Sequence, residues 1–138
     1  MIKAELGRQL MINVDNTVGS LAEVTSVVSA SSINQIAICA YSVGKKVAIM
    51  CVTEDNNAAK KLLEDQGFLV QEEEVVLLTI DNKAGSLQRV TDKIAEAGVD
   101  LKLIYGSVSP GQESARIVII AENNLDVIMV IKTELERS

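Results

Sequence analysis

Histidine and tryptophan are absent from the chain, and only Tyr41, Phe68 and Tyr105 are aromatic among its 138 residues. Without histidine the protein lacks the usual general base at neutral pH, and no Ser-His or Cys-His nucleophile pair can form. So few aromatic rings leave little material for stacking on bases or for caging a cation. These absences argue against most catalytic sites and against recognition of nucleic-acid bases.

Positive charge and long apolar runs are also scarce. Thirteen Lys and Arg against nineteen Asp and Glu give a net charge of −6, which opposes binding to nucleic acid. Apolar runs such as residues 117–121 fall far short of the roughly twenty residues that span a bilayer. The N-terminus shows no charged segment followed by an apolar stretch, as a secretory signal would. We expect a cytoplasmic protein with no nucleic-acid or membrane partner, and any ligand to be small.

Cysteine occurs only at Cys39 and Cys51, in two expected neighbouring strands. A tight hairpin could bring them opposite each other, so a disulfide is conceivable. The lack of an export signal favours two buried reduced thiols instead, and the lack of histidine argues against structural zinc. The acidic residues 72–74 predict a solvated linker, because three consecutive side chains of an extended segment cannot converge on one ion. We expect no metal and no cofactor.

Two segments sixty-six positions apart repeat almost residue for residue. The first loop, residues 15–21, reads Asp-Asn-Thr-Val-Gly-Ser-Leu, and the second loop, residues 81–87, reads Asp-Asn-Lys-Ala-Gly-Ser-Leu. Seven of the eleven residues from Asp15 to Thr25 are identical in the second copy. The chain is a tandem duplication, and we expect domains at residues 1–73 and 74–138, each near the lower size limit for an independent core.

The first module shows the order strand, helix, strand, strand, helix, strand. Leu21, Val24 and Val28 recur at helical spacing after the first loop and predict a buried stripe. Asn56 and Asn57 are typical caps of a second helix. Strands are expected at residues 9–14, 33–41, 47–52 and 68–71, and the second helix is expected to stop at Gly67.

The second module repeats this order but ends early. Strands are expected at residues 75–80, 99–108 and 115–121, with a helix lined by Leu87, Val90, Ile94 and Ala97 and a last helix over residues 125–135. The missing fourth strand would leave an edge whose backbone groups need a partner. We hypothesise that residues 2–6, which alternate apolar and polar side chains, cover an edge in the same chain or in a partner.

This element order is the split arrangement of a ferredoxin-like fold, with two helices on one face of an antiparallel sheet. The sequence therefore predicts an α+β protein of two ferredoxin-like βαββαβ modules, of which the second lacks its last strand.

Both repeated loops are expected between a strand and a helix. Backbone N–H groups at a helix start attract carboxylates, and Asp15 and Asp81 add a carboxylate on the other side of each loop. A zwitterion could place its carboxylate on the amides and its ammonium on the aspartate. The alternative is that the Asp, Asn, Gly and Ser residues only form turns and caps, which helix starts need in any case.

The loops, the duplication and the strand order resemble a tandem pair of ACT domains, the regulatory modules of amino-acid metabolic enzymes. The hallmark of that family is a strand ending in Asn, a short loop with Gly and a Leu that opens the first helix. A second landmark, a Gly-Ile-Asn-like step, is present as Ser32, Ile33 and Asn34 and as Gly98, Val99 and Asp100. The chain departs from the pattern at Val18 and Ala84, where many members have Pro, at Ser32, and in the absent last strand.

The resemblance implies a sensor that binds a free amino acid at an interface between modules and modulates an enzyme or another partner, with a homodimer expected. The alternative is a non-catalytic interaction subunit without a ligand, and an enzyme is disfavoured because no catalytic motif accompanies the scattered carboxylates. The candidate ligand-binding residues are Asp15, Asn16, Val18, Gly19, Ser20, Leu21 and Asn34 in the first module, and Asp81, Asn82, Ala84, Gly85, Ser86, Leu87 and Asp100 in the second.

Overall fold

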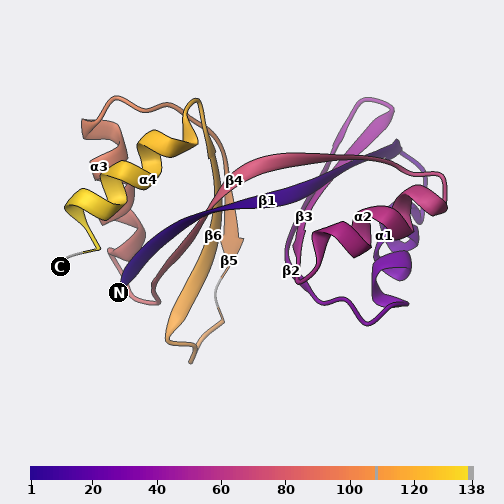
Figure 1. The fold of residues 1–138 in the computed structure, drawn as a ribbon, viewed down its shortest axis with the longest axis horizontal. Coiled ribbons are helices and arrows are strands. Elements are labelled where there is room, and N and C mark those ends of the chain that lie inside the picture. The colour runs from indigo at the N-terminus through magenta and orange to yellow at the C-terminus, as the bar shows by residue number, and fades with distance from the viewer. Residues whose placement is uncertain (108, 137–138) are drawn as a thin grey trace. The chain divides into compact units, whose positions relative to one another are not determined.

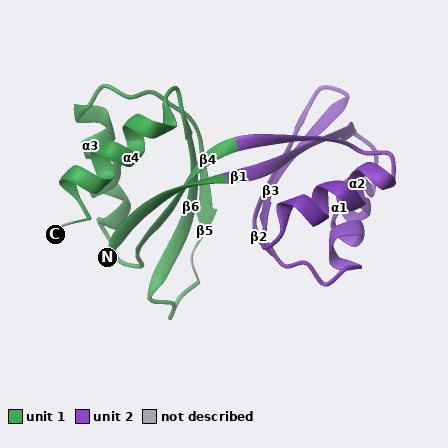
Figure 2. Ribbon diagram, viewed as in Figure 1, with its two compact units in different colours: residues 1–7, 74–138 green, residues 8–73 purple. Residues whose placement is uncertain are grey.

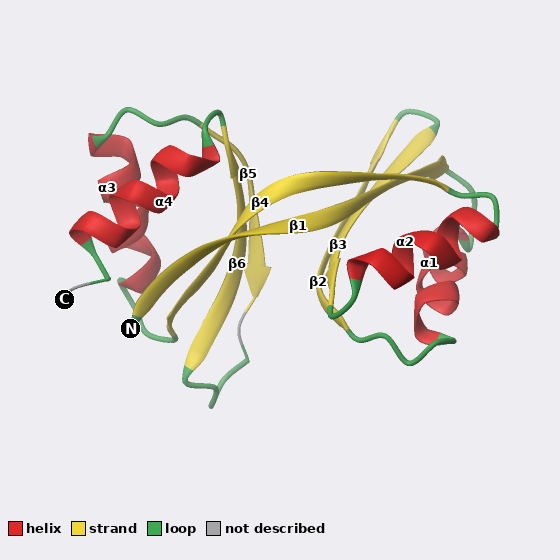
Figure 3. Cartoon of the chain, in the orientation of Figure 1, coloured by secondary structure: helices red, strands yellow, loops and turns green. Residues whose placement is uncertain are grey.

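A computed structural model describes residues 1–107 and 109–136 of the chain (Figure 1). The strands and helices follow one another in the expected order (Figure 3). They are β1 Ile2–Asp15, α1 Ser20–Ser29, β2 Gln35–Val43, β3 Lys46–Thr53, α2 Asn56–Asp65, β4 Leu69–Asp81, α3 Ser86–Glu96, β5 Leu101–Ser107, β6 Ser114–Ala121 and α4 Asn124–Glu134. None of the helices in the described residues is both long and apolar enough to cross a bilayer.

The chain divides into two compact units (Figure 2). Unit 2 comprises residues 8–73, and unit 1 comprises residues 1–7 and 74–138. The strand order is β2-β3-β1-β4 in unit 2 and β1-β4-β6-β5 in unit 1, because β1 and β4 each contribute residues to both units. Each unit thus has a four-stranded sheet, and two helices pack on it, which confirms the predicted α+β class with ferredoxin-like topology.

The start of β1 supplies the strand that the second module lacks. Ile2 and Ala4 are buried in the core of unit 1, together with Val76 and Leu78 of β4. The backbone N–H of Asp81 donates to the carbonyl of Met1 at 3.1 Å. Residues 2–6 therefore cover the open edge within the same chain, as hypothesised. Ile2 and Ala4 reach the core because a strand alternates its faces, whereas Leu6 is 46% exposed.

Both long strands exceed their predicted bounds. β1 is continuous over 14 residues rather than starting at Gln9, and β4 is continuous over 13 residues. The predicted linker at residues 72–74 is wrong, because these glutamates lie inside β4. Their polar groups have partners there: Arg8 Nε donates to Glu72 Oε2 at 3.3 Å, and Asn124 Nδ2 donates to the carbonyl of Glu74 at 3.0 Å.

The predicted cap of the second helix is also wrong. Asp55 caps α2, since its carboxylate accepts from the N–H of Ala58 at 3.1 Å. Asn56 instead joins three segments: its Oδ1 accepts from the N–H of Thr53 at 3.0 Å, and its Nδ2 donates to the carbonyl of Arg8 at 2.9 Å. The predicted strand over residues 99–108 is observed as Leu101–Ser107, and Val108 lies outside the described residues, as do the last two residues of the expected second domain.

Each unit has its own apolar core between its sheet and its helices. Buried residues of unit 2 are Leu10, Ile12, Val24, Val28, Ile49, Cys51, Ala59, Leu63 and Val70. Those of unit 1 include Val76, Leu78, Ile80, Val90, Ile94, Ile119, Val127 and Ile131. Because each module buries equivalent positions, the duplication extends from the loops to the packing.

The cysteines do not form a disulfide. Cys39 lies opposite Met50, and Cys51 lies opposite Ile38 in the antiparallel β2–β3 pair. Residues one position apart along a strand face opposite sides of the sheet, so the two thiols point away from each other. Both are free, and burial raises the pKa of the Cys51 thiol to about 11.

Candidate functional site

The two loops share one backbone conformation. The N–H of Thr17 donates to the carbonyl of Asp15 at 2.9 Å, and the N–H of Lys83 donates to that of Asp81 at 3.0 Å. The residue before each helix, Gly19 or Gly85, has a φ of 90°, which is left-handed backbone that favours glycine. The duplicated sequence thus gives two strand-to-helix turns with the same backbone hydrogen bonds and the same left-handed glycine.

The asparagines of the repeat connect each loop to the neighbouring hairpin. Asn16 N–H donates to the carbonyl of Lys45 at 2.8 Å, and Asn82 N–H donates to that of Glu113 at 2.9 Å. The Nδ2 of Asn82 also donates to the carbonyl of Gln112 at 2.8 Å. These contacts give both asparagines a structural role, and they fix the hairpin beside the loop.

Neither α1 nor α3 is capped by a side chain, although the sequence allows Ser20 and Ser86 to be caps. Both serines are buried at the first helical position, with relative exposures of 8% and 5%, and the helices begin after glycine without a side-chain cap hydrogen bond. The Ser20 hydroxyl lies 2.8 Å from the carbonyl oxygen of Asp15, to which it can donate. The serine therefore ties the loop to its strand and leaves the first N–H groups of the helix without a side-chain acceptor.

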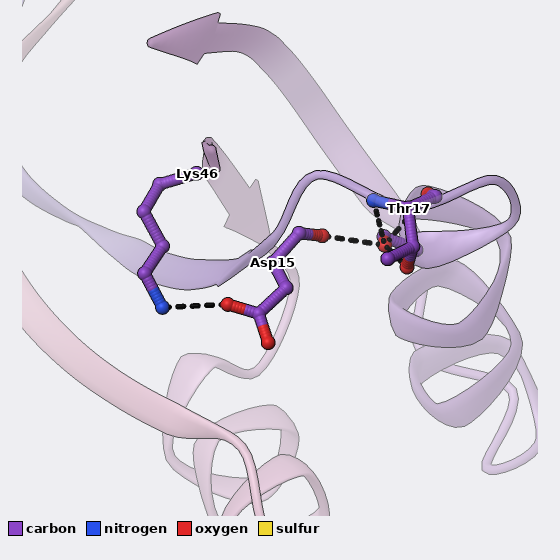
Figure 4. Close-up of polar contacts among 4 residues, drawn as sticks. Asp15, Thr17 and Lys46 are labelled. Atoms are coloured by element: carbon purple, nitrogen blue, oxygen red, sulfur yellow. Dashed lines mark hydrogen bonds and ion pairs between the residues drawn. The ribbon is translucent and has the colours of Figure 1, made fainter. Parts of the chain in front are cut away.

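Both aspartates of the repeat face an amine. Lys46 Nζ lies 2.6 Å from Asp15 Oδ1 on the exposed side of the first loop (Figure 4). The hydrogen bond and the charge of Lys46 hold the pKa of the Asp15 carboxyl below its ordinary value. Asp81 pairs with the N-terminal amine of Met1, and chiefly this hydrogen bond lowers the pKa of Asp81. The repeated carboxylate thus accepts an ammonium group at both loops in this structure.

A pocket of about 400 Å³ borders the first loop within unit 2. Of the predicted residues, Asn16, Gly19, Ser20 and Leu21 line it. The other side comes from Ala22 of α1, Ala40, Tyr41 and Ser42 of β2, and Val47 of β3. Leu21, expected in a buried stripe, is 42% exposed because it faces this pocket rather than the core.

A pocket of about 650 Å³ borders the second loop within unit 1. Of the predicted residues, Asp81, Asn82, Gly85 and Leu87 line it. Further lining residues are Ile80, Lys83, Gln88, Thr91, Gly106, Ser107, Ala115 and Ile117. A loop and its edge strand thus border an open pocket in each unit, with volumes in the range of small-molecule sites.

Several predicted residues lie elsewhere. Val18 is fully exposed, and it and Ala84 line neither pocket. Asn34 lies next to Gln35, which pairs with Thr53 at the end of β3. The first loop begins at Asp15, which pairs with Lys46 at the start of β3, so Asn34 and the loop lie at opposite ends of that strand. Asp100 occupies the corresponding place, where its carbonyl accepts from the N–H of Glu122 at 3.0 Å.

The loop sequences do not point to the hairpin residues of the two pockets, since these residues lie far from the loops in the chain. The strand register identifies them, because Asp15 pairs with Lys46 and Asp81 pairs with Ser114. Tyr41 lines the first-loop pocket, and Tyr105 does not line the second-loop pocket. No group of three or more His, Cys, Asp or Glu in the described residues could hold a metal ion.

No protein-family model and no curated protein matches the sequence. Among solved structures, a protein of Bacteroides thetaiotaomicron is 29% identical, with a TM-score of 0.87 over 95% of this chain and 90% of that one. The regulatory subunit of aspartate kinase from Thermus thermophilus, in its ligand-free form, is 14% identical, with a TM-score of 0.64 over 98% and 97% of the two chains. Aspartokinase III of E. coli, in complex with aspartate and ADP, is 16% identical, with a TM-score of 0.59 over 97% of this chain and 33% of the enzyme. The fold of this chain is therefore ACT-like, as the sequence predicts.

Proposed function

We propose that the protein is a non-catalytic regulatory sensor that binds a free amino acid at its repeated loops. The observation that carries this proposal is the uncapped helix start at each loop, which borders a pocket. The other two helices are capped by side chains, α2 by Asp55 and α4 by Asn123, whose Oδ1 accepts from the N–H of Leu125 at 3.1 Å. The first N–H of each loop helix donates to a loop carbonyl, Ser20 to Thr17 and Ser86 to Lys83, at 3.2 Å. A ligand carboxylate would supply to α1 and α3 the further acceptor that no side chain provides.

The ammonium of the ligand has acceptors at the second loop, whereas Asp15 does not line the first-loop pocket. Asp81 lines the second-loop pocket and already accepts an ammonium group from Met1. Gln88 lines the same pocket; its Nε2 donates to Asp92 at 2.6 Å, so its carbonyl oxygen can face a ligand. A zwitterion thus meets donors at the helix start and acceptors beside them, while apolar groups such as Leu87 contact its carbon chain.

In this proposal, ligand binding changes the association of the protein with a partner, which is a second copy of the chain or an enzyme. The free edge of unit 2 is β2, whose nine residues carry no charge and expose Ile36 and Ile38 by 43% and 44%. Edge strands without charges or Pro readily pair with another strand. Residues of β2 also line the first-loop pocket, so a ligand there would adjoin the partner and shift association by its differential affinity.

Light scattering of the Ile36→Lys variant tests this dimer. The variant is expected to be monomeric at concentrations where the unaltered chain is dimeric, because a buried ammonium would oppose the edge pairing. Ile104→Lys on β5, the edge of unit 1, is the matched control and leaves the dimer intact. A monomeric unaltered chain would refute the homodimer.

Ligand binding is tested by thermal unfolding in the presence of each of the twenty amino acids. At least one is expected to stabilise the protein by more than about 1 kcal/mol at several times its dissociation constant. The variants Ala22→Glu and Gln88→Glu place a carboxylate in the first turn of α1 and α3, where it favours the helix but repels a ligand carboxylate. Each is expected to weaken binding at its own loop, while Asn57→Glu in the first turn of α2 leaves binding unchanged.

The competing function is an interaction subunit whose loops bind nothing. It requires that no amino acid raises the unfolding temperature and that a stoichiometric protein partner stays bound to Ala22→Glu, Gln88→Glu and the unaltered chain alike. That pair of results would refute the sensor.

A further inference from the structure

We propose, on the basis of the proposed function, that the two pockets take different ligands and that the second-loop pocket takes an amino acid with a carboxylate in its side chain. The proposal rests on matched positions of the duplication at which the two pockets differ.

The first matched position lies in the loop itself. Thr17 lines the first-loop pocket, and Lys83 lines the second-loop pocket at the position sixty-six residues later. Among residues 1–107 and 109–136, Lys83 forms no ion pair. Its ammonium is therefore available to an anionic group of a ligand, which the hydroxyl of Thr17 could not neutralise.

The charge at the helix start differs in the same direction. The first turn of α1 carries Glu23, and the matched residue of α3 is Arg89. Lys83 and Arg89 act on Asp81 as well, since both add to the lowering of the pKa of that carboxyl by the Met1 amine. At these two matched positions the second loop has two cations where the first has a neutral hydroxyl and an anion, which favours an anionic ligand there. The hairpin beside each loop differs the other way, with Lys46 at the first loop and Ser114 at the second, but Lys46 is already paired with Asp15.

The third matched position affects the volume of each pocket. Tyr41 pairs with Ala48, two residues along β3 from Lys46, and Ser107 pairs with Arg116, two residues along β6 from Ser114. Tyr41 and Ser107 are therefore equivalent, and each lines the pocket of its own unit. The smaller serine agrees with the larger volume, about 650 Å³ against about 400 Å³.

The fourth matched position adds a polar wall. Gln88 lines the second-loop pocket, where the first-loop pocket has Ala22. With Lys83 and Ser107 it gives the second pocket three polar side chains at positions that hold Thr17, Ala22 and Tyr41 in the first. A ligand with a second carboxylate has partners in the second pocket, whereas the first pocket suits a smaller neutral amino acid.

Isothermal titration of the full chain with aspartate, glutamate, asparagine and glutamine tests the proposal. Each acid and its amide have nearly the same size, so their difference isolates the side-chain charge. We expect one acid to bind about tenfold more tightly than its amide, as a hydrogen bond between charged groups allows. Lys83→Thr should remove that preference and leave binding of the amide within about twofold, while Thr17→Lys should leave binding of the acid at the second loop unchanged.

Two different failures can be told apart. If amino acids bind, and Gln88→Glu weakens that binding, but acid and amide bind equally or Lys83→Thr leaves the acid preference intact, the ligand class is refuted and the sensor stands. If none of the twenty amino acids binds, the proposed function itself fails. Amide chemical shifts of Leu87 and Ser107 that move with an acid, without movement at Leu21 and Ser42, would locate the binding in the second pocket; the reverse pattern would overturn the assignment.

Discussion

The first and second loops have the same backbone and different surroundings. Both run from a strand through a left-handed glycine into a helix without a side-chain cap. Their pockets differ where the sequence repeat is broken, at Thr17 and Lys83, and where the hairpins supply Tyr41 or Ser107. Duplication has therefore preserved the turn geometry, which packing demands, while the lining residues, which packing does not fix, have diverged.

The second helices of the two modules provide the internal reference for this comparison. Asn56 and Asn124 hold equivalent sites: Asn56 Nδ2 donates to the carbonyl of Arg8 at 2.9 Å, and Asn124 Nδ2 donates to that of Glu74 at 3.0 Å. These helices keep side-chain caps in both copies. An uncapped start is therefore specific to the loop helices rather than a general property of the chain.

Exchanging residues between the two copies tests whether their differences matter, and Gly106→Ala is expected to have the largest effect. Ala40 occupies the equivalent position of β2, yet a Cβ at Gly106 would lie 2.6 Å from Ile117 Cδ1 and 2.7 Å from the carbonyl oxygen of Arg116. Such overpacking typically costs about 1–3 kcal/mol of the free energy of unfolding. Urea denaturation measures the loss.

The reverse exchange, Ala40→Gly, is the matched control. It creates no clash and is expected to cost only about 0.5–1 kcal/mol, through the greater entropy of glycine in the unfolded chain. If Gly106→Ala is as stable as the unaltered protein, the two edge strands have the same freedom at this position, and the difference between the pockets would lie in their side chains alone.

Ser32→Gly makes the two modules alike at the step from the first helix into the second strand. Ser32 has a φ of 59°, and its equivalent Gly98 has a φ of 74°. Left-handed backbone destabilises a residue with a Cβ by about 1–2 kcal/mol. Replacing it with glycine relieves this strain, but the greater entropy of glycine in the unfolded chain offsets part of the gain. We expect Ser32→Gly to stabilise the protein by about 0.5–1 kcal/mol in urea denaturation.

Gly98→Ser is the converse change and should destabilise by a similar amount. A loss of stability in Ser32→Gly would show that the serine is held by side-chain contacts rather than tolerated. The departure of Ser32 from the family pattern would then be a feature of the first module, instead of a mild strain.

The sequence predicted the fold because the fold depends on periodicity, which is local. The helical spacing of Val24 and Val28, the alternation in residues 2–6 and the repeat itself suffice for two α+β modules. The length of β4 was not predictable from local signals, since Glu72 is tolerated in a strand only through partners such as Arg8, distant in sequence.

Only the loop side of each pocket was predictable from the sequence, because only that side is formed by residues that are close together in the chain. The loop residues that line the pockets stand together in the chain, so Gly19 and Gly85 were found. The opposite wall comes from the hairpins, and only the strand register brings Tyr41 or Ser107 to the loop. Whether a serine caps a helix or turns inward, as Ser20 does, depends on the buried carbonyl that it meets, which no spacing rule reveals.

Lys46→Ser is expected to have the smallest effect, and it tests the polar side of the comparison. Lys46 pairs with Asp15, whereas the equivalent partner of Asp81 is Ser114. Lys46 lowers the folded-state pKa of Asp15 below its ordinary value of 3.8. The pair therefore stabilises the folded protein at pH values above that ordinary pKa. This contribution to stability is lost as the pH falls through the folded-state pKa. In Lys46→Ser the Asp15 pKa should rise towards 3.8, as followed by NMR titration of the carboxyl carbon.

The accompanying change in stability should be small and should vanish in high salt, because the pair is exposed. Ser114→Lys is the converse change, and it adds an ammonium group opposite Asp81 without altering the titration of Asp15. If the Asp15 titration is the same in Lys46→Ser as in the unaltered chain, Lys46 does not hold that carboxylate in solution. Asp15 would then be free to accept a ligand ammonium, whereas Asp81 would still be paired with the amine of Met1.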